Sequence, residues 1–400
     1  MLYRADKYGN KLSILGFGCM RFPQRLGVID YKKTQELISF AIKNGVNYFD
    51  TAYLYPGSEE TLGSILRRLN KRADVYIASK LPIMICNKPD DFDRYLNESL
   101  KRLKTEYCDY YLMHNFPGSA AWEKMKSLGI IPWLERQKKS GTIKQAGFSF
   151  HGNRDEFIKI LNDYDWDFCQ IQYNYSDENY QAGKTGLLAA AAKHIPVIIM
   201  EPLLGGKLAK ELPKAAWKAF EQDNPALSPA ARGLLWLWNQ QEVTVVLSGM
   251  NAQSQLEENI ALAGEAVPGC VPRNDIYEIV RAEFARSYKI RCTGCNYCQP
   301  CPKGINIPGC FAAYNTSYVL GLFEGIKQYT MSTGSHSDNP RGARLCVKCG
   351  ACEKHCPQNI PIRAMLENVQ KRLEPFYFKT AIWFIKTFWF KSGNSDRAGA

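Results

Sequence analysis

The C-terminal third of the sequence contains eight cysteines in two short runs, each followed by proline. They are spaced x2-x2-x2 in the first run and x2-x2-x3 in the second: Cys292, Cys295, Cys298, Cys301, and Cys346, Cys349, Cys352, Cys356. In ferredoxins with two 4Fe-4S clusters, three cysteines of a run surround one cluster and the fourth ligates the other. The spacing therefore predicts two clusters with crossed ligation. The predicted ligand sets are Cys292, Cys295, Cys298 with Cys356, and Cys346, Cys349, Cys352 with Cys301.

Zinc is the alternative to clusters, because two Cys-x-x-Cys pairs can make a tetrahedral zinc site. The two segments form an internal repeat, CTGCNYCQPCPKGINIP and CVKCGACEKHCPQNIPI, and Cys-Pro endings in such a repeat favour clusters. Residues 302–345, between the runs, include helix-like stretches such as CFAAYNTSYVLGLFEGIKQY. This pattern predicts a mostly helical two-cluster ferredoxin-like domain.

A second group of reactive side chains lies in the N-terminal half. Asp50, Lys80 and His114 each end a short apolar run, and Tyr55 follows in the segment DTAYLY. Each residue alone has a structural explanation, such as a helix cap or a buried histidine. Together they suit carbonyl reduction, because a tyrosine can donate the proton and a nearby ammonium lowers the pKa of a phenol. In this interpretation Asp50 holds Lys80, and His114 donates a hydrogen bond to the substrate oxygen.

These residues must be positioned by apolar runs that alternate with helical stretches over residues 13–260. The runs, which read as strands, are SILGFGC (13–19), VNYFD (46–50), VYIASK (75–80), YYLMH (110–114), IKQAGFS (143–149), FCQIQY (168–173), IPVIIM (195–200) and VTVVLS (243–248). Strands alternating with helices indicate parallel pairing, and eight such units predict a closed β/α (TIM) barrel, an α/β fold. A doubly wound open sheet is the alternative, but its usual GxGxxG turn is absent. At the barrel mouth the four polar residues would meet.

The segments DTAYLYPGSEETLG, IASKLP and YYLMHNFP resemble the three signature segments of the aldo/keto reductase superfamily. The resemblance extends over nearly the whole barrel, and the cysteine runs make the chain similar to members with a C-terminal 4Fe-4S ferredoxin-type domain. The matching residues form the catalytic tetrad of that family, with tyrosine as general acid: Asp50, Tyr55, Lys80 and His114. The family binds NAD(P)H across the barrel mouth without a Rossmann fold, and the resemblance implies the same here.

The resemblance also implies which residues contact the nicotinamide cofactor. Gly18 and Met20 match positions against the cofactor backbone, and Ser149 and Gln170 match those that hold the carboxamide. The loop over the pyrophosphate and the adenosine segment (248–259) supply five further contacts: Gly205, Gly206, Gln255, Glu258 and Asn259.

The sequence departs from the common family pattern at several cofactor positions. Phe150 stands where many members have asparagine after the serine, and Met200 stands where many stack a tyrosine on the nicotinamide. Gly249, Met250 and Gln255 occupy positions that often supply a cation to the 2′-phosphate of NADPH. The choice between NADH and NADPH therefore stays open, as does binding of another planar cofactor such as a flavin.

Four regions are predicted along the chain. They are an aldo/keto reductase-like barrel (1–265), a linker and connecting helix (266–287), a ferredoxin-like iron–sulfur domain (288–373) and an aromatic and basic tail (374–400). In the tail, FYFKTAIWFIKTFWFK (376–391) alternates aromatic residues with lysines. An interfacial membrane helix or a partner-docking helix is one interpretation. A tail folded over the protein's own surface is the favoured one.

The composition is that of a cytoplasmic globular protein. The sequence has 400 residues and a formal net charge of +12, but its Lys and Arg residues are scattered, which argues against nucleic-acid binding and suits an acidic partner or anionic cofactor. A spanning helix and a signal peptide are not expected, because no long apolar run is present. Six cysteines outside the runs are expected to be buried thiols in a reducing compartment. They are Cys19, Cys86, Cys108, Cys169, Cys270 and Cys310.

The favoured function is an NAD(P)-dependent oxidoreductase that reduces a small-molecule carbonyl or oxidises an alcohol, with two clusters that exchange electrons with a redox partner protein. A nicotinamide gives up two electrons together whereas a cluster takes one, so a flavin at the barrel mouth is one way to connect them. The alternative is an electron-transfer or redox-sensing protein whose barrel only binds a nucleotide or flavin. In a third hypothesis the clusters are purely structural.

Overall fold

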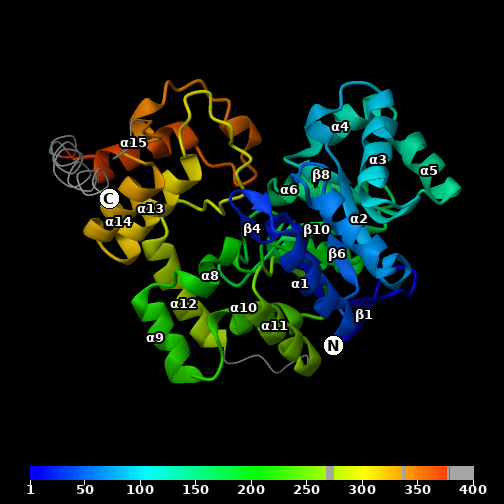
Figure 1. Cartoon of the computed structure of the whole chain (residues 1–400), viewed down its shortest axis with the longest axis horizontal. Helices are drawn as coiled ribbons and strands as arrows, with labels where there is room; N and C mark the ends of the chain where they lie inside the picture. The colour runs from blue at the N-terminus through cyan, green and yellow to red at the C-terminus, as the bar shows by residue number, and fades with distance from the viewer. Residues whose placement is uncertain (267–273, 336–338, 376–377, 379–400) are drawn as a thin grey trace, which may run out of the picture. The chain divides into compact units, whose positions relative to one another are not determined.

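Eight parallel strands close into a barrel in the computed structural model (Figure 1). Their order around the barrel is β10-β11-β12-β3-β6-β7-β8-β9. The strands are β3 (Leu15–Gly18), β6 (Tyr48–Asp50), β7 (Tyr76–Leu81), β8 (Cys108–Phe116), β9 (Ile143–Phe150), β10 (Phe168–Gln172), β11 (Val197–Met200) and β12 (Val243–Ser248). The prediction of eight strands in a closed barrel is confirmed.

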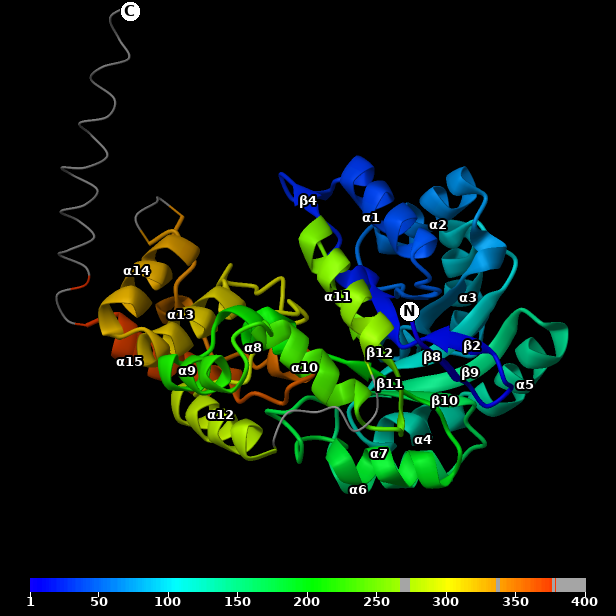
Figure 2. The ribbon, with the colours of Figure 1, turned by 90° about the horizontal axis from the view of Figure 1, so that it is seen from below.

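Helices follow the strands along the chain and lie outside them (Figure 2). In this part of the chain they are α1 (Tyr31–Lys43), α2 (Ser58–Leu69), α3 (Asp90–Leu103), α4 (Ser119–Ser127), α5 (Ile130–Ser140), α6 (Arg154–Asn162), α7 (Gly183–Ala192), α10 (Pro229–Trp238) and α11 (Gln253–Glu265). Local sequence sets their ends. The Asp30 side chain accepts a hydrogen bond from the Lys33 amide at the start of α1, and Gly45, at a φ of 89°, allows the chain to turn after it.

The amino-terminal end of the barrel is closed by a hairpin of β1 (Tyr3–Ala5) and β2 (Lys11–Ser13). The buried Asp6 carboxylate in its loop accepts hydrogen bonds from Tyr110 Oη at 2.6 Å and from Asn10 Nδ2 at 2.9 Å. Above it the barrel interior holds the buried aromatic rings of Tyr48, Tyr110 and Phe168. The barrel interior is therefore filled at this end, which leaves the interior of the opposite end for a ligand.

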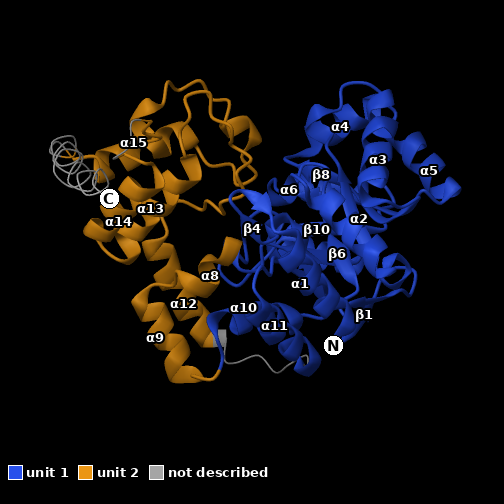
Figure 3. Cartoon of the chain, in the orientation of Figure 1, with its two compact units in different colours: residues 1–204, 227–273 blue, residues 205–226, 274–400 orange. Residues whose placement is uncertain are grey.

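Contacts divide the chain into two units (Figure 3). Unit 1 comprises residues 1–204 and 227–273, and unit 2 comprises residues 205–226 and 274–400. The structure describes residues 1–266, 274–335, 339–375 and 378. The sequence predicts a barrel over 1–265 and a linker and connecting helix over 266–287, whereas the contacts group residues 205–226 and 274–287 with unit 2.

The difference has a packing cause within unit 2. Helix α9 (Lys214–Asp223) packs against α12 (Asn274–Ser287), with the rings of Phe220 and Tyr277 in edge contact at 5.8 Å. Tyr288, the residue after α12, donates a hydrogen bond from its Oη to the Glu211 carboxylate, so the segment 205–226 contacts both α12 and the residue that follows it. Residues 205–226 lie between barrel segments in the sequence, but their contacts place them in unit 2.

The rest of unit 2 is a small helical domain around the cysteine runs. Its helices are α8 (Lys207–Lys210), α9, α12, α13 (Ile307–Val319), α14 (Leu322–Ser332) and α15 (Ile362–Leu373). The buried Asn315 of α13 fixes the start of the first run, since its Oδ1 accepts from the amides of Lys289 and Ile290 and its Nδ2 donates to Ile290 O at 2.7 Å. The predicted mostly helical C-terminal domain is confirmed.

Five of the six scattered cysteines are buried and free, as expected: Cys19, Cys86, Cys108, Cys169 and Cys310. Burial raises the pKa of Cys86 and Cys108 to about 12, so both thiols stay protonated and inert. Cys270 and the aromatic segment 376–391, apart from Phe378, lie outside the described residues. Among the helices that the structure describes, none has the length and apolar character needed to cross a membrane.

Candidate functional site

The ammonium of Lys80 is the centre of a hydrogen-bonded group where β6 and β7 end. Lys80 Nζ donates to Asp50 Oδ1 at 2.6 Å, to the Thr51 carbonyl at 2.8 Å and to Tyr55 Oη at 3.4 Å. Lys80 is 1% exposed and Asp50 4% exposed, so the ion pair is shielded from water. Because an ammonium has three N–H groups, all of them are used and the side chain is fixed in one direction.

Tyr55 lies between this ion pair and His114. Its hydroxyl oxygen is the acceptor in the bond from Lys80, which keeps its own proton as a donor for another group. Its ring is 5.8 Å from the His114 imidazole, at an interplanar angle of 82°. The structure thus brings together all four residues that the sequence predicted as a tetrad, around one half-buried phenol.

His114 is buried in a setting that favours its neutral form. Burial lowers the pKa of His114 well below 6.5, and the charge of Lys80 and the neighbouring His151 lower it further. A neutral imidazole has one N–H donor and one acceptor nitrogen. His114 can therefore donate a hydrogen bond to an oxygen without carrying a charge.

Two residues predicted to hold a carboxamide are also placed at the strand ends. Gln170 Nε2 donates to Asp50 Oδ2 at 2.9 Å, so this amide contacts the tetrad. Ser149 Oγ accepts from the Asn115 amide at 2.7 Å, and Asn115 has a φ of 65°, a conformation that asparagine tolerates. The contact between Gln170 and Asp50 cannot be predicted from local sequence, because the two residues are 120 positions apart.

The other predicted cofactor residues of unit 1 lie along β3, β12 and α11. Gly18 is the last residue of β3, and a side chain there would begin 3.4 Å from the Ser248 carbonyl. Asn259 is buried and donates to Ser248 Oγ at 3.1 Å, whereas Gln255 and Glu258 lie on α11 and accept from the Asn251 amide and from Ser228 Oγ. Met20 is half-buried two residues after Gly18. In unit 2, Gly205 and Gly206 have φ values of 72° and 98°, which side chains disfavour.

Two polar residues of unit 1 were missed by the sequence analysis. The Arg21 side chain passes 3.4 Å from the point where a Gly249 side chain would begin, which places a guanidinium-bearing residue beside the predicted adenosine segment. His151, 7% exposed, follows β9 and shares a 3.2 Å hydrogen bond between its Nδ1 and Gln181 Oε1. The only sequence signal for either was its place just after a predicted strand.

The eight cysteines of unit 2 line two separate cavities. The first cavity is lined by Cys292, Cys295, Cys298 and Cys356, and the second by Cys301, Cys346, Cys349 and Cys352. Each cavity thus takes three cysteines from one run and one from the other, in the grouping that the spacing predicted. Four thiolates around a cavity are the donor set that 4Fe-4S clusters use. Within the described residues, no group of His, Cys, Asp and Glu converges closely enough to hold a single metal ion.

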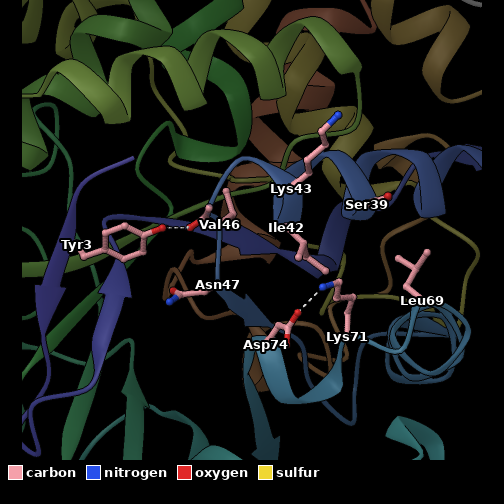
Figure 4. A pocket seen from close by; sticks show the side chains of 10 residues that line it. Tyr3, Ser39, Ile42, Lys43, Val46, Asn47, Leu69, Lys71 and Asp74 are labelled. Carbon is pink, nitrogen blue, oxygen red and sulfur yellow. Dashed lines mark hydrogen bonds and ion pairs between the residues drawn. The ribbon is translucent and has the colours of Figure 1, made fainter.

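A further cavity of about 530 Å³ lies at the other end of the barrel strands (Figure 4). Its lining includes Asn47, just before β6, and Asp74, just before β7, so it is at the amino-terminal strand ends. Lys71 and Asp74, which both line this cavity, form an ion pair at 2.5 Å. Active sites of β/α barrels form at the carboxyl ends of the strands, and this cavity lacks the tetrad.

Comparison with known proteins assigns a family to the barrel region and a domain type to the cysteine-containing region. The sequence profile of the aldo/keto reductase family matches residues 14–267, and that of a 4Fe-4S dicluster domain matches residues 291–360. The chain is similar to the aldo-keto reductase yakc of Schizosaccharomyces pombe, at 22% identity over 293 residues, 63% of this chain and 84% of that protein. It is also similar to L-galactose dehydrogenase of Arabidopsis thaliana, at 26% identity over 285 residues, 64% and 86% of the two proteins.

Among solved structures, the holo form of an aldo-keto reductase from Bacillus halodurans has the same fold. The TM-score is 0.58 at 21% identity, and the match covers 70% of this chain and 96% of that one. The barrel and the cysteine-lined helical unit define a two-part protein of the oxidoreductase class. The chain belongs to the aldo/keto reductase family and carries a 4Fe-4S domain at its C-terminal end.

Proposed function

We propose that the protein is an NAD(P)H-dependent oxidoreductase that reduces a small-molecule carbonyl, or oxidises the corresponding alcohol, at the mouth of its barrel. The observation that carries this proposal is the hydrogen-bonded chain from Asp50 through Lys80 to Tyr55. A bound reduced nicotinamide supplies the two electrons and one hydrogen of the reduction. The S. pombe relative is named for NADP(+), which fits the same cofactor class.

The residues of the chain have separate tasks in this reaction. Tyr55 gives its hydroxyl proton to the substrate oxygen as negative charge develops there, and the Lys80 ammonium stabilises the resulting phenolate. Asp50 holds the ammonium in place at 2.6 Å. His114, in its neutral form, donates a hydrogen bond that orients the substrate oxygen. Alcohol oxidation is the reverse, with the phenolate taking up the proton.

The polar residues near the mouth fit a nicotinamide dinucleotide. Ser149 and Gln170 present buried polar groups beside the tetrad, as an amide-bearing ring requires. The adjacent segment, with Asn259 buried on α11, suits the adenosine end. Arg21 supplies a cation beside Gly249, at a position where this sequence lacks the usual one. Its presence favours NADPH over NADH.

The second part of the proposal is that each cysteine-lined cavity holds one 4Fe-4S cluster. The first cluster would be held by Cys292, Cys295, Cys298 and Cys356, and the second by Cys301, Cys346, Cys349 and Cys352. When bound, such clusters store and pass single electrons. Exchange with a redox partner protein therefore belongs to the proposed function, and a flavin at the barrel is a further candidate to connect two-electron and one-electron steps.

Steady-state reduction of a carbonyl panel by the anaerobically purified protein tests the enzyme. Tyr55→Phe removes the proton donor and is expected to lower kcat by about 10²-fold to 10⁴-fold. Tyr53→Phe is the matched control, because Tyr53 lies in the same loop but packs on Tyr95 at 4.9 Å. Equal activity of Tyr55→Phe and wild type contradicts the assignment of the proton donor.

The eight-cysteine arrangement favours a second function, an electron-transfer or redox-sensing protein whose barrel only binds a nucleotide or flavin. Iron, sulfide, flavin and nicotinamide analysis, combined with the activity assay, separates the two functions. Intact clusters without activity in the wild type favour the electron-transfer protein. Bleaching of the cluster absorption by NADPH, with or without added flavin, reports whether the barrel and the clusters exchange electrons.

A further inference from the structure

The two cysteine-lined cavities of unit 2 differ in the charge of their walls. Apart from cysteines, the first cavity is lined by apolar or uncharged side chains such as Ile307, Phe311 and Gln358. The second cavity is lined by two cations, Lys303 and Arg363, together with apolar residues. Arg363 is paired with Glu353 at 2.7 Å, so Lys303 supplies the net positive charge of this wall. A positive charge favours a site that gains an electron, which makes the second cavity the better electron acceptor.

The two cavities also differ in their exposure to solvent. Cys349 of the second cavity is the one exposed cysteine among the eight, and the other seven are partly buried. Val347, two residues before it, is 58% exposed although it is apolar. An exposed ligand beside an exposed apolar side chain marks the side from which another molecule can approach the second cavity closely.

The surface around Cys349 and Val347 carries mostly positive charge. The chain segments that form it, 301–310 and 341–367, contain six Lys or Arg residues and two carboxylates. Both carboxylates are already paired, Glu353 with Arg363 at 2.7 Å and Glu367 with Lys348 at 2.5 Å. Lys303 is exposed and lines the second cavity. The surface therefore presents a net positive field around an apolar centre.

We propose that this surface, formed by Lys303, Val347, Lys348, Cys349 and Arg363 and called here the Cys349 surface, docks an acidic one-electron carrier protein. The inference rests on the proposed function, in that the second cavity must hold a cluster. In each encounter the reduced carrier loses one electron and the cluster site gains it, with no atom transferred. Opposite charges steer such short-lived encounters and raise their rate at low ionic strength.

The test is stopped-flow reduction of the anaerobic holoprotein by a dithionite-reduced plant-type [2Fe-2S] ferredoxin, an acidic carrier. Lys303→Glu combined with Lys348→Glu is expected to lower the second-order rate constant at least tenfold at low salt. The difference is expected to vanish at high ionic strength. Lys214→Glu combined with Lys327→Glu is the matched control, because both residues are exposed in unit 2 and lie on α9 and α14.

The outcomes separate this inference from the proposal on which it rests. Iron, sulfide and electron paramagnetic resonance signals are measured on each variant. Protein without clusters overturns both the two-cluster proposal and the docking surface. If the clusters are intact and the carrier reduces both double variants at the wild-type rate, the docking surface alone is overturned. Tight binding to phosphatidylserine vesicles, together with a rate of reduction by the carrier that does not depend on salt, also overturns the docking surface. The surface would then contact a membrane.

Discussion

The side-chain amide of Gln170 donates a 2.9 Å hydrogen bond to the carboxylate of Asp50. The other oxygen of that carboxylate receives the Lys80 ammonium at 2.6 Å. Asp50 is therefore held from two sides, and its direction toward Lys80 is fixed before any substrate binds. Gln170 is in this view a positioning residue for the tetrad, in addition to its proposed contact with the cofactor.

Replacement of Gln170 by leucine is expected to lower kcat by about 10-fold to 150-fold, because a hydrogen bond to a charged group contributes about 1.5–3 kcal/mol. Steady-state kinetics over a range of pH would measure the change. Gln137→Leu is the control, since Gln137 makes an equivalent amide-to-carboxylate bond, to Asp93 at 2.8 Å, on α5. A rise in KM for the nucleotide, with kcat and its pH profile unchanged, would limit Gln170 to cofactor binding.

Arg21 is expected to decide the choice between NADPH and NADH. Loss of its cation in Arg21→Gln should raise KM for NADPH at least tenfold and change KM for NADH less than twofold, because only NADPH carries the 2′-phosphate. Arg25→Gln is the control, since Arg25 is exposed four residues further on. Equal effects on the two nucleotides would place Arg21 outside the 2′-phosphate site.

The buried histidines predict a loss of stability in mild acid. Burial lowers the pKa of His151 to about 4, and that of His114 is also lowered. At a pH between such a lowered pKa and 6.5, the unfolded chain binds more protons than the folded one. The free energy of unfolding therefore falls as pH falls. For His151 this amounts to about 1.4 kcal/mol per pH unit, or about 2 kcal/mol between pH 6.5 and 5.

Urea unfolding at pH 7 and pH 5 would measure this loss. His151→Gln is expected to lose about 2 kcal/mol less than wild type between the two values. His194→Asn is the control, because His194 is exposed and asparagine suits its φ of 54°. An unchanged pH dependence in His151→Gln would show that His151 is already protonated in the folded protein at pH 5.

Asn315 is expected to be essential for the first cysteine run. Asn315→Leu removes three hydrogen bonds to the backbone of Lys289 and Ile290, at about 1 kcal/mol each, and should cost about 3 kcal/mol of unfolding free energy. Chemical denaturation followed at the cluster absorption band, with iron content, would measure this. Asn368→Ala, at a half-buried position of α15, is the control. Wild-type iron content and stability in Asn315→Leu would show that these three hydrogen bonds are not needed to hold the first cysteine run.

The barrel and most of the candidate site residues followed from the sequence, because their signals are local. Each strand is a short apolar run, and a polar residue at its end, such as Asp50 or His114, must face the barrel mouth. The cysteine spacing is equally local, and it limits how a run can surround a cluster. For these features the tertiary structure added distances, such as the 2.6 Å between Lys80 and Asp50.

Contacts between distant parts of the sequence came only from the tertiary structure. Spacing and periodicity carry no information on which side chain lies beside Gly249 or Asp50, and packing places Arg21 and Gln170 there. Similarly, residues 205–226 fold with unit 2 because their buried contacts, such as Phe220 with Tyr277, lie there. The residue types and their spacing set the chemistry that each segment can carry. The tertiary structure decided which groups support it, because those neighbours are chosen by long-range packing.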